Sequence, residues 1–362
     1  MKYSLVSFTN VESVRTLNYI KNSTIKKNFY INLIAFNKHD HLVLNLVLYF
    51  LFSPLIIFSI LFIFIFKKHE EKIIVIFPGV IELIILKFFS LFKSIDIYFD
   101  FFTSFYLTLV LDRAKISNKS LAAKILIAVD KLIFKLSDFQ IVETDEMKEF
   151  IKEELEIDTE HTHSLLTPRK ELNIIKSKTN EIRLVFWGNF AEMHGIDFIL
   201  DAAKQIKDRN IKFDLIGEGS LFKHIESRII SENIENVVLH GYLKYFDENI
   251  KSLSDIISSS TICLGTFSDN VKNNLVVPHK IIEALSFSKP VITGSTDTIN
   301  RMLEGIVLTV EPKNGKDLAK KIMSIVYDEN KLNEMAEKGY QYFLEKFSEE
   351  SFTKNINSIM EK

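Results

Sequence analysis

Short apolar runs alternate with amphipathic stretches throughout the second half of the chain. Near-continuous apolar runs separated by helical periodicity are typical of parallel strands whose sheet is covered by helices on both faces. The predicted strands span residues 183–187, 212–216, 236–239, 261–265, 290–293 and 306–310. The predicted helices span residues 196–207, 221–232, 250–257, 279–287 and 315–327. The pattern therefore predicts an α/β domain built on a parallel sheet.

The first half of the chain repeats this alternation less clearly. Strand-like runs lie at residues 3–8, 29–35, 72–77, 95–99 and 139–142, and helical patterns lie at 120–136 and 145–155. Residues 156–168 are polar and lack periodicity, so we place a linker there. We expect an N-terminal domain over residues 1–168 and a C-terminal domain over residues 169–338. Two such units form a cleft, and ligands of parallel sheets collect at the carboxyl ends of the strands.

Residues 42–66 carry no charged side chain and reach the ~20 residues that a transmembrane helix needs. Asn45 and the central pair Ser53 and Pro54 argue against one straight span. Because predicted strands of one sheet flank the segment, both of its ends must lie on the same side of a membrane. We therefore favour a helical hairpin or an interfacial helix that enters from one face. A true span and a buried core helix are the alternatives.

Composition and charge exclude several functional classes. The 362 residues have a net charge of −2, with 45 basic and 47 acidic side chains, so the basic excess of a nucleic-acid-binding protein is absent. Cys263 is the single cysteine, which excludes an intrachain disulfide and a cysteine metal centre. No long apolar region directly follows the first residues, as it would in a signal peptide. We expect the protein at the cytoplasmic face of a membrane.

The stretch from Val277 to Leu285 carries the most informative chemistry. Pro278 suits the first turn of a helix, because its missing N–H costs nothing there. The start of that helix combines backbone donors, the positive end of the dipole and Lys280, which together suit a phosphate. Glu283 lies one turn further along the same face, where its carboxylate can hold two vicinal sugar hydroxyls. This arrangement predicts a nucleotide-sugar site; for this motif alone, a surface glutamate on an ordinary helix is the alternative.

Five stretches, in the same order along the chain, resemble the GT-B glycosyltransferases and specifically the retaining group called glycosyltransferase family 4. They are residues 186–197, 213–219, 236–242, 264–267 and 277–292. The resemblance covers roughly residues 181–327. It implies an α/β fold of two Rossmann-like domains that face a cleft, with the apolar segment 42–66 as a membrane-associating insertion in the N-terminal domain. It also implies that residues 339–362 form a helix packing back on that domain.

The chain departs from the family pattern at the phosphate and sugar positions. Many members carry two glutamates separated by seven residues; Glu283 matches the second, but Leu275 stands in place of the first. The family's basic pair after the first strand is also altered, with Asn189 and His194 near those places. The resemblance then implies that Lys280 is the main phosphate cation. His194, if protonated by a pyrophosphate, would supply part of the lost charge.

The resemblance implies transfer of a sugar from a nucleotide-diphosphate donor to an acceptor hydroxyl. Preorganised cations and N–H donors aimed at the departing diphosphate lower the barrier of such a reaction. The expected catalytic residues are Lys280, His194 and, from the first domain, Asp100, whose alternative role is to cap a turn. The expected donor-binding residues are Gly188, Asn189, Gly217, Glu218, Gly219, Thr266, Val277, Pro278 and Glu283, with backbone amides of residues 274–278. We expect no metal and no other cofactor, and the chain contains no Asp-x-Asp pair.

The apolar segment and the resemblance together suggest a membrane-associated enzyme. Its expected partners are a nucleotide sugar and a lipid-linked saccharide or glycolipid acceptor, as in the assembly of surface polysaccharide or glycolipid. No nucleic acid is expected. Three alternatives remain: a nucleotide-sugar epimerase of the same fold, a degenerate transferase that serves as a membrane scaffold or partner subunit, and a simple membrane anchor protein.

Overall fold

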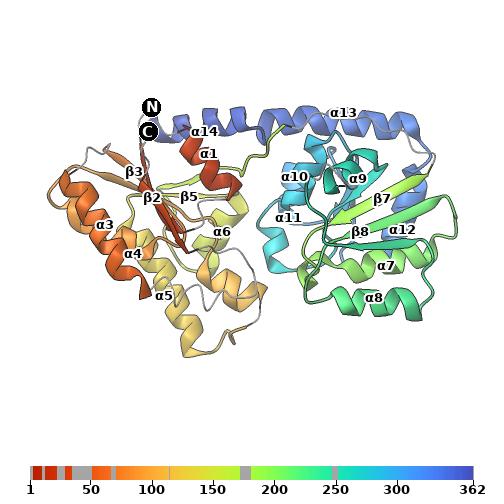
Figure 1. The fold of residues 1–362 in the computed structure, drawn as a ribbon, viewed down its shortest axis with the longest axis horizontal. Helices are drawn as coiled ribbons and strands as arrows, with labels where there is room; N and C mark the ends of the chain where they lie inside the picture. Colours follow the sequence, from red (N-terminus) through yellow and green to blue (C-terminus); the bar gives the residue numbers. More distant parts are fainter. Residues whose placement is uncertain are drawn as a thin grey trace. The chain divides into compact units, whose positions relative to one another are not determined.

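The computed structural model describes residues 3–9, 13–22, 29–34, 51–66, 71–113, 115–171, 181–246 and 252–361. The chain divides into two compact units (Figure 1). Unit 1 comprises Met1–Pro168 and Glu349–Lys362, and unit 2 comprises Arg169–Ser348. Each unit is an α/β structure with a parallel sheet at its centre.

Unit 1 contains a parallel sheet in the order β2-β1-β3-β4-β5-β6. The strands are β1 (Ser4–Thr9), β2 (Phe29–Ile34), β3 (Lys72–Ile76), β4 (Asp96–Asp100), β5 (Phe139–Val142) and β6 (Thr162–Ser164). The described side chains of β3 are buried beyond Lys72, as expected of a central strand covered on both faces. The strand β6 pairs with β5. The linker that we predicted over residues 156–168 is therefore partly an edge strand, too short for its alternation to be recognised.

The helices of unit 1 cover both faces of this sheet. They are α1 (Val14–Asn22), α3 (Ser53–Phe66), α4 (Val80–Ser90), η2 (Leu107–Asp112), α5 (Leu121–Leu136), α6 (Asp145–Glu154) and α14 (Glu349–Glu361). Parallel crossovers are right-handed, so α1, which leads from β1 outward to β2, lies on the opposite face from α3, α4 and α5. Local sequence sets the helix starts: Ser120 caps α5 and Thr144 caps α6 through their hydroxyl oxygens.

The end of the chain completes the core of unit 1. Helix α14 packs beside α1, and its apolar side chains join those of the first strands in one cluster. The rings of Tyr19 and Phe352 meet edge to face with centroids 5.2 Å apart. The returning segment begins at Glu349 rather than at residue 339, because α13 (Glu329–Lys346) belongs to unit 2 and ends just before it.

Only part of the apolar segment 42–66 lies within the described residues. Its second half forms α3, whereas residues 42–50 lie outside the described part. In the ranges that the structure describes, no helix is both long enough and apolar enough to cross a bilayer.

Unit 2 contains a second parallel sheet in the order β12-β11-β10-β7-β8-β9. The strands are β7 (Ile182–Trp187), β8 (Ile211–Ile216), β9 (Val237–Gly241), β10 (Ile262–Leu264), β11 (Val291–Gly294) and β12 (Leu308–Val310). Besides α13, the helices are α7 (Ile196–Gln205), α8 (Phe222–Ser231), α9 (Leu253–Ser259), α10 (His279–Ser286), α11 (Asp297–Met302) and α12 (Gly315–Ile325). Each predicted strand of this half is present with boundaries shifted by at most two residues.

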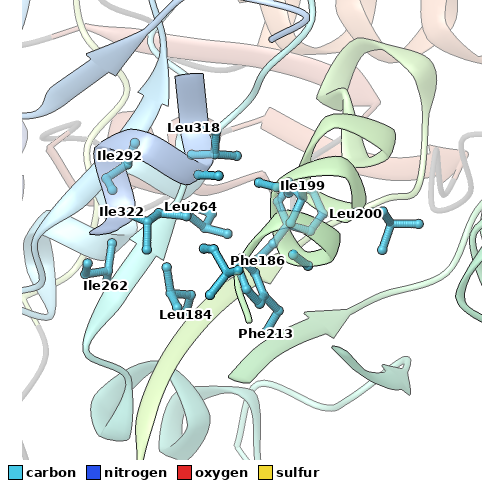
Figure 2. Packing of buried hydrophobic residues seen from close by; sticks show 14 of the residues in the cluster. Leu184, Phe186, Ile199, Leu200, Phe213, Ile262, Leu264, Ile292, Leu318 and Ile322 are labelled. Carbon is cyan, nitrogen blue, oxygen red and sulfur yellow. The ribbon is translucent and has the colours of Figure 1, made fainter. Parts of the chain in front are cut away.

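A single apolar cluster lies between this sheet and the helices α7 and α12 (Figure 2). Alternate side chains of the strands face it, such as Leu184 and Phe186 of β7 and Phe213 of β8, while α7 contributes Ile199 and Leu200. These side chains are fully buried. The cluster fixes β7, β8 and β10 against one another and so holds the loops that follow them.

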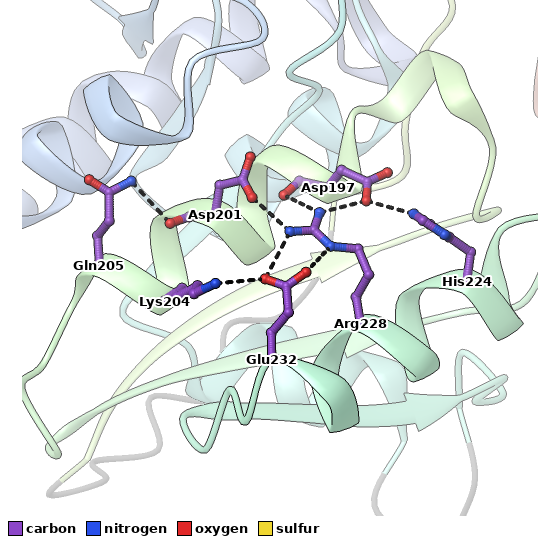
Figure 3. Close-up of polar contacts among 7 residues, drawn as sticks. All are labelled: Asp197, Asp201, Lys204, Gln205, His224, Arg228 and Glu232. Carbon is purple, nitrogen blue, oxygen red and sulfur yellow. Dashed lines mark hydrogen bonds and ion pairs between the residues drawn. The ribbon is translucent and has the colours of Figure 1, made fainter.

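Polar side chains attach the outer helix α8 to α7 (Figure 3). The guanidinium of Arg228 donates to Asp197 Oδ1 at 2.7 Å, to Asp201 Oδ1 at 2.8 Å and to Glu232 Oε1 at 2.6 Å. Hydrogen bonds from Arg228 and Lys204 lower the pKa of Glu232 to about 2. Because one planar guanidinium serves carboxylates of both helices, the network fixes the register of α8 on α7.

Candidate functional site

The sheet of unit 2 reverses its direction of strand addition between β7 and β10. From β7 the chain adds β8 and β9 on one side, and from β10 it adds β11 and β12 on the other. β7 and β10 therefore mark the switch point of the sheet, and the edge beside the carboxyl ends of such strands is where open parallel sheets bind ligands. Gly188 begins the loop after β7, and Gly265 and Thr266 begin the loop after β10.

Glycines bring two loops at this edge into direct contact. Gly217 and Gly219 have φ angles of 140° and 153°, and a Cβ at Gly217 would lie 1.9 Å from the carbonyl oxygen of Gly188. A Cβ at Gly219 would lie 2.2 Å from Asn189 Oδ1. We expected these two glycines to admit a base or ribose. Their nearest neighbours in the protein are atoms of residues 188–190, and this loop packing, together with the positive φ angles, accounts for glycine at both positions. The expected approach to a base or ribose stays a prediction.

A third glycine, Gly195, closes the loop after β7 against the loop after β10. Its φ is 65°, and an added Cβ would lie 2.7 Å from backbone atoms of both Phe267 and Ser268. The two loops are also hydrogen-bonded, since Ser268 Oγ and Asn273 Nδ2 both donate to the carbonyl oxygen of Met193. Ser268 and Asn273 escaped the sequence prediction because polar loop residues have no periodicity that marks them.

Helix α10 begins beside these loops. Pro278 is its N-cap residue rather than a residue of its first turn, and the first intrahelical bond runs from Ile281 N–H to the Pro278 carbonyl. Val277, immediately before it, is buried. Within the expected 274–278 amide group, the N–H of Leu275 already donates to the Lys272 carbonyl at 3.0 Å. That amide is therefore not available to a phosphate.

Lys280 is the distinctive side chain at this helix start. It is only 8% exposed, and no atom in the described ranges accepts a hydrogen bond from its Nζ. The Nζ lies 3.7 Å from the centroid of the Phe186 ring and would lie 3.3 Å from a Cβ at Gly188. Burial lowers the pKa of Lys280 well below its usual range, and Glu283 opposes only part of that effect. A buried ammonium without a partner is costly, so this position is set up for an anion.

His194 lies at the same place, at the end of the turn η3 (Glu192–His194). Its Nδ1 is hydrogen-bonded to the carbonyl oxygen of Asn189, which leaves Nε2 as the acceptor nitrogen of a neutral ring. Burial, followed by the charge of Lys280, lowers the pKa of His194 to about 3. The ring is therefore neutral at neutral pH in the protein as it stands. A positive charge on His194 requires a bound anion.

Glu283 lies one turn beyond Lys280 and is held by two aromatic residues. Its Oε2 accepts a hydrogen bond from Trp187 Nε1 at 2.7 Å. The Tyr245 hydroxyl is also hydrogen-bonded to the Glu283 carboxylate. Burial, followed by the charge of that carboxylate, raises the pKa of Tyr245. We did not predict either partner. Trp187 is the only tryptophan and ends a strand directly before Gly188, which was the available signal; Tyr245 lies in a loop with no such signal.

The other expected donor-binding residues lie at the same edge of the sheet, and their side chains differ in exposure. Asn189 and Glu218 are exposed, and the Glu218 carbonyl accepts the N–H of Phe190 at 2.8 Å. Thr266 is buried, and its backbone is tied to β11 through the Thr293 hydroxyl and the N–H of Gly294. The structure thus gathers the residues expected in unit 2 at one edge of the sheet. Their roles in binding remain predictions.

Asp100 belongs to unit 1, at the carboxyl end of β4. The carboxylate is 1% exposed and accepts hydrogen bonds from Arg15 Nε and Nη2 at 2.7–3.0 Å and from the Tyr19 hydroxyl at 3.2 Å. Arg15 also donates to the carbonyl oxygen of Leu165. The bidentate pair of the Asp100 carboxylate with the Arg15 guanidinium joins α1 to the sheet, and the oxygens of Asp100 are occupied by these donors. This geometry favours a structural role over acceptance of a proton.

Residues 169–342 match the family described as glycosyl transferases group 1. An uncharacterised glycosyltransferase of Methanocaldococcus jannaschii is 28% identical over 187 residues, which are 49% of this chain and 47% of the relative. A poly(ribitol-phosphate) alpha-N-acetylglucosaminyltransferase of Staphylococcus aureus is 28% identical over 164 residues, 43% of this chain and 30% of the relative. The chain thus spans less than half of the length of each of these curated relatives.

Solved structures resemble both units. The crystal structure of Anabaena HepE in complex with UDP superposes with a TM-score of 0.71 at 13% identity, and the match covers 100% of both chains. At this identity the likeness establishes the fold, which is the α/β GT-B-like fold with two parallel sheets. Residues 169–342 therefore form a glycosyl transferases group 1 domain within a GT-B-like fold.

Proposed function

We propose that the protein is a glycosyltransferase that takes its sugar from a nucleotide-diphosphate donor bound at the carboxyl edge of the unit 2 sheet. One observation carries the proposal: the buried Nζ of Lys280 has no hydrogen-bond partner in the described residues, at the start of a helix and at the switch point of the sheet. A diphosphate supplies the missing acceptors and the missing negative charge. Residues 169–342 also match a glycosyltransferase family.

In this proposal, Lys280 stabilises the charge that develops on the departing diphosphate. The group is preorganised by its burial against Phe186, so little reorganisation is needed during the reaction. The dipole of α10 adds to its field. His194 becomes a second cation when the diphosphate raises the pKa of its ring. Glu283, held by Trp187, accepts hydrogen bonds from the ribose hydroxyls.

We propose a uridine nucleotide sugar as the donor and a membrane-linked saccharide or lipid as the acceptor. Support for the donor comes from HepE, which was crystallised with UDP. Support for a cell-envelope acceptor comes from the S. aureus relative, which is named for transfer to poly(ribitol-phosphate). Retention of the anomeric configuration and independence from a metal ion belong to the same proposal.

A donor screen by thermal shift tests the nucleotide site directly. At 100 times its dissociation constant, a ligand stabilises by ~2.7 kcal/mol, which for a unit of this size raises Tm by roughly 5–10 °C. We expect such a rise with a UDP-sugar and a smaller rise or none with the GDP and CDP compounds. Lys280→Met should remove the rise. Lys316→Met, which alters an exposed lysine of α12, is the control and should behave as wild type.

Incubation of the purified protein with labelled UDP-sugars, with and without a lipid-linked acceptor, then tests transfer. Appearance of labelled acceptor supports the proposal. If every nucleotide sugar leaves the Tm of the wild-type protein unchanged, the proposed site is wrong.

The degenerate-transferase alternative has one observation in its favour. Leu275 stands where the family has its first glutamate, and its side chain is buried and apolar. Position 275 therefore provides no carboxylate. A protein that binds UDP in the screen but transfers no sugar from any donor to any acceptor tested would fit a partner subunit better than an enzyme.

A further inference from the structure

Helix α4 of unit 1 presents an apolar stripe to the surface. Ile84, Phe88, Leu91 and Phe92 are all exposed, Leu91 and Phe92 by 74% and 73%. Their spacing of four, three and one places them on one side of the helix and of the turn that follows it. The rings of Phe88 and Phe92 meet edge to face with centroids 5.4 Å apart. Several large apolar side chains grouped in this way mark an interaction surface.

The neighbouring helices extend this stripe on both sides. Helix α4 packs against α3 and against α5 (Figure 1), and all three cover the same face of the sheet. On α5, Leu121, Ile125 and Leu132 are exposed at helical spacing. On and just before α3, the exposed side chains are Leu51, Leu55, Ile57 and Phe58. We call the exposed apolar residues of these three helices the α3–α4–α5 face.

The charged side chains of this face are basic. Lys124, Lys131 and Lys135 follow one another along α5 at helical spacing, directly beside its apolar stripe. All three lysines are exposed, and Lys131 lies 3.6 Å from the carboxylate of Glu156, which follows α6. The acidic side chains of α4 and α5, Glu82 and Asp130, are fully buried. Asp130, for example, accepts hydrogen bonds from Ser104 and from backbone amides of residues 105 and 106.

We propose that the α3–α4–α5 face docks unit 1 on the surface of an anionic lipid bilayer. An apolar stripe flanked by lysines is the pattern of helices that lie in the membrane interface, where the lysines are attracted to anionic headgroups. A protein partner fits less well, because lysine is depleted at protein–protein interfaces. The inference rests on the proposed function in one respect, since a membrane-bound acceptor requires the enzyme to reach the bilayer.

Vesicle flotation with the purified full chain tests the face. We expect the protein to float with vesicles of phosphatidylglycerol and phosphatidylcholine and to stay behind with phosphatidylcholine alone. The double variant Leu91→Glu, Phe92→Glu should lose binding. Lys124→Gln, Lys135→Gln should weaken the apparent affinity by about tenfold or more, since each lysine near the surface contributes ~1 kcal/mol.

Ile230→Glu provides a matched control, because Ile230 is also 74% exposed but lies on α8 of unit 2. It should bind vesicles as wild type does. The proposal is overturned if the Leu91 and Phe92 variant floats as well as wild type, or if binding is the same on neutral vesicles. It is also overturned if the wild-type chain self-associates without lipid and that variant alone makes it monomeric, because a second copy would then be the occupant.

Two further measurements separate this proposal from the proposed function. The Leu91 and Phe92 variant should keep the UDP-sugar thermal shift, which also establishes that it is folded. Lys280→Met should lose that shift but keep vesicle binding. If the wild-type protein does not float but shows the UDP-sugar thermal shift, only the proposed membrane docking of the α3–α4–α5 face is rejected. If it floats but shows no thermal shift, only the proposed nucleotide site is rejected.

Discussion

At the scale of single residues, the environment of Lys280 determines the protonation of its amino group. The same lysine on an exposed helix would be an ordinary hydrated cation. Burial against Phe186, without a hydrogen-bond acceptor from the described residues, lowers the pKa of its ammonium and makes the charged form dependent on an anion. His194 beside it has its pKa lowered to about 3 for the same reasons. In the proposed nucleotide site, ligand binding is therefore coupled to protonation of both groups.

We predict that UDP binding takes up protons from solution. A bound diphosphate raises the pKa values of Lys280 and His194 from their depressed values in the free protein, so the complex holds more protons than its parts. Affinity should then increase as pH falls from the pKa values of the complex toward those of the free protein. Isothermal titration calorimetry in buffers of different ionisation enthalpy measures the uptake. A double variant, Lys280→Met with His194→Gln, should show none, and buffer-independent heats in wild type would contradict the prediction.

His194 also makes the stability of unit 2 depend on pH. Its folded-state pKa of about 3 lies below the unfolded value, so between pH ~6.5 and ~3 the unfolded chain binds more protons. The contribution of His194 to stability is complete above pH ~6.5 and is lost as pH falls through this window. Urea unfolding across pH 4–7 should therefore show a weaker pH dependence in His194→Gln than in wild type. Identical slopes would mean that the ring is not neutralised by the fold.

The indole of Trp187 has a testable role in positioning Glu283. Trp187→Phe keeps the aromatic ring but removes the N–H donor to Oε2, and we expect it to weaken nucleotide binding by ~1.5 kcal/mol. A rise in the donor KM with little change in kcat is the expected kinetic result. In a Glu283→Ala background the same change should have little further effect. Additive losses would show that Trp187 acts independently of Glu283.

At the scale of elements, loops at the carboxyl edge of the unit 2 sheet pack as closely as a core does. The loop after β7 is enclosed by the loop after β8 through Gly217 and by the loop after β10 through Gly195. Because side chains at these glycines would overlap backbone atoms, the three loops are in direct contact, and hydrogen bonds from Ser268 and Asn273 to the Met193 carbonyl join two of them. A preorganised anion site requires loops that support one another in this way.

A pair of glycine variants separates close packing from backbone strain. Gly217→Ala places a Cβ within 1.9 Å of the Gly188 carbonyl oxygen and should destabilise unit 2 by ~3 kcal/mol or more. Gly241→Ala also has a positive φ, of 68°, but its Cβ meets no atom within 4 Å, so only the conformational cost of ~1–2 kcal/mol remains. Urea unfolding measures both. Equal losses would mean that the loop contact with Gly188 contributes nothing.

At the scale of the whole molecule, the two ends of the chain fold into one unit. Phe352 and Ile356 of α14 are buried against residues of the first strand and of α1, so unit 1 is complete only when the last helix is in place. Unit 2 is continuous in sequence, from Arg169 to Ser348, and the described residues of its apolar cluster all belong to unit 2. The two units therefore depend differently on the C-terminus.

Removal of residues 349–362 should destabilise unit 1 selectively. The deletion uncovers the apolar surface that α14 buries, and each large side chain lost from a core costs ~2–5 kcal/mol. We expect rapid proteolysis within residues 1–168, while unit 2 keeps its thermal transition and its UDP-dependent shift. The milder variant Phe352→Ala should also increase the rate of proteolysis of unit 1. Lys354→Ala, which alters an exposed residue of α14, should leave that rate unchanged. Unchanged proteolysis of unit 1 would contradict the packing.

The sequence by itself determined the α/β alternation, the strands of unit 2 and the gathering of Gly188, His194, Lys280 and Glu283 at one sheet edge. The alternation and the strands follow from local periodicity. The gathering follows from the rule that ligands of parallel sheets collect at the carboxyl ends of the strands, together with the family resemblance that singled out Gly188 and His194. Only the tertiary structure decided the electrostatics and the partners. The burial of Lys280 depends on which elements cover its side chain. The hydrogen bond from Trp187 to Glu283 and the ion pair of Arg15 with Asp100 each join residues 85 or more positions apart. Local sequence patterns carry no information about such contacts, because they arise only when distant elements pack together.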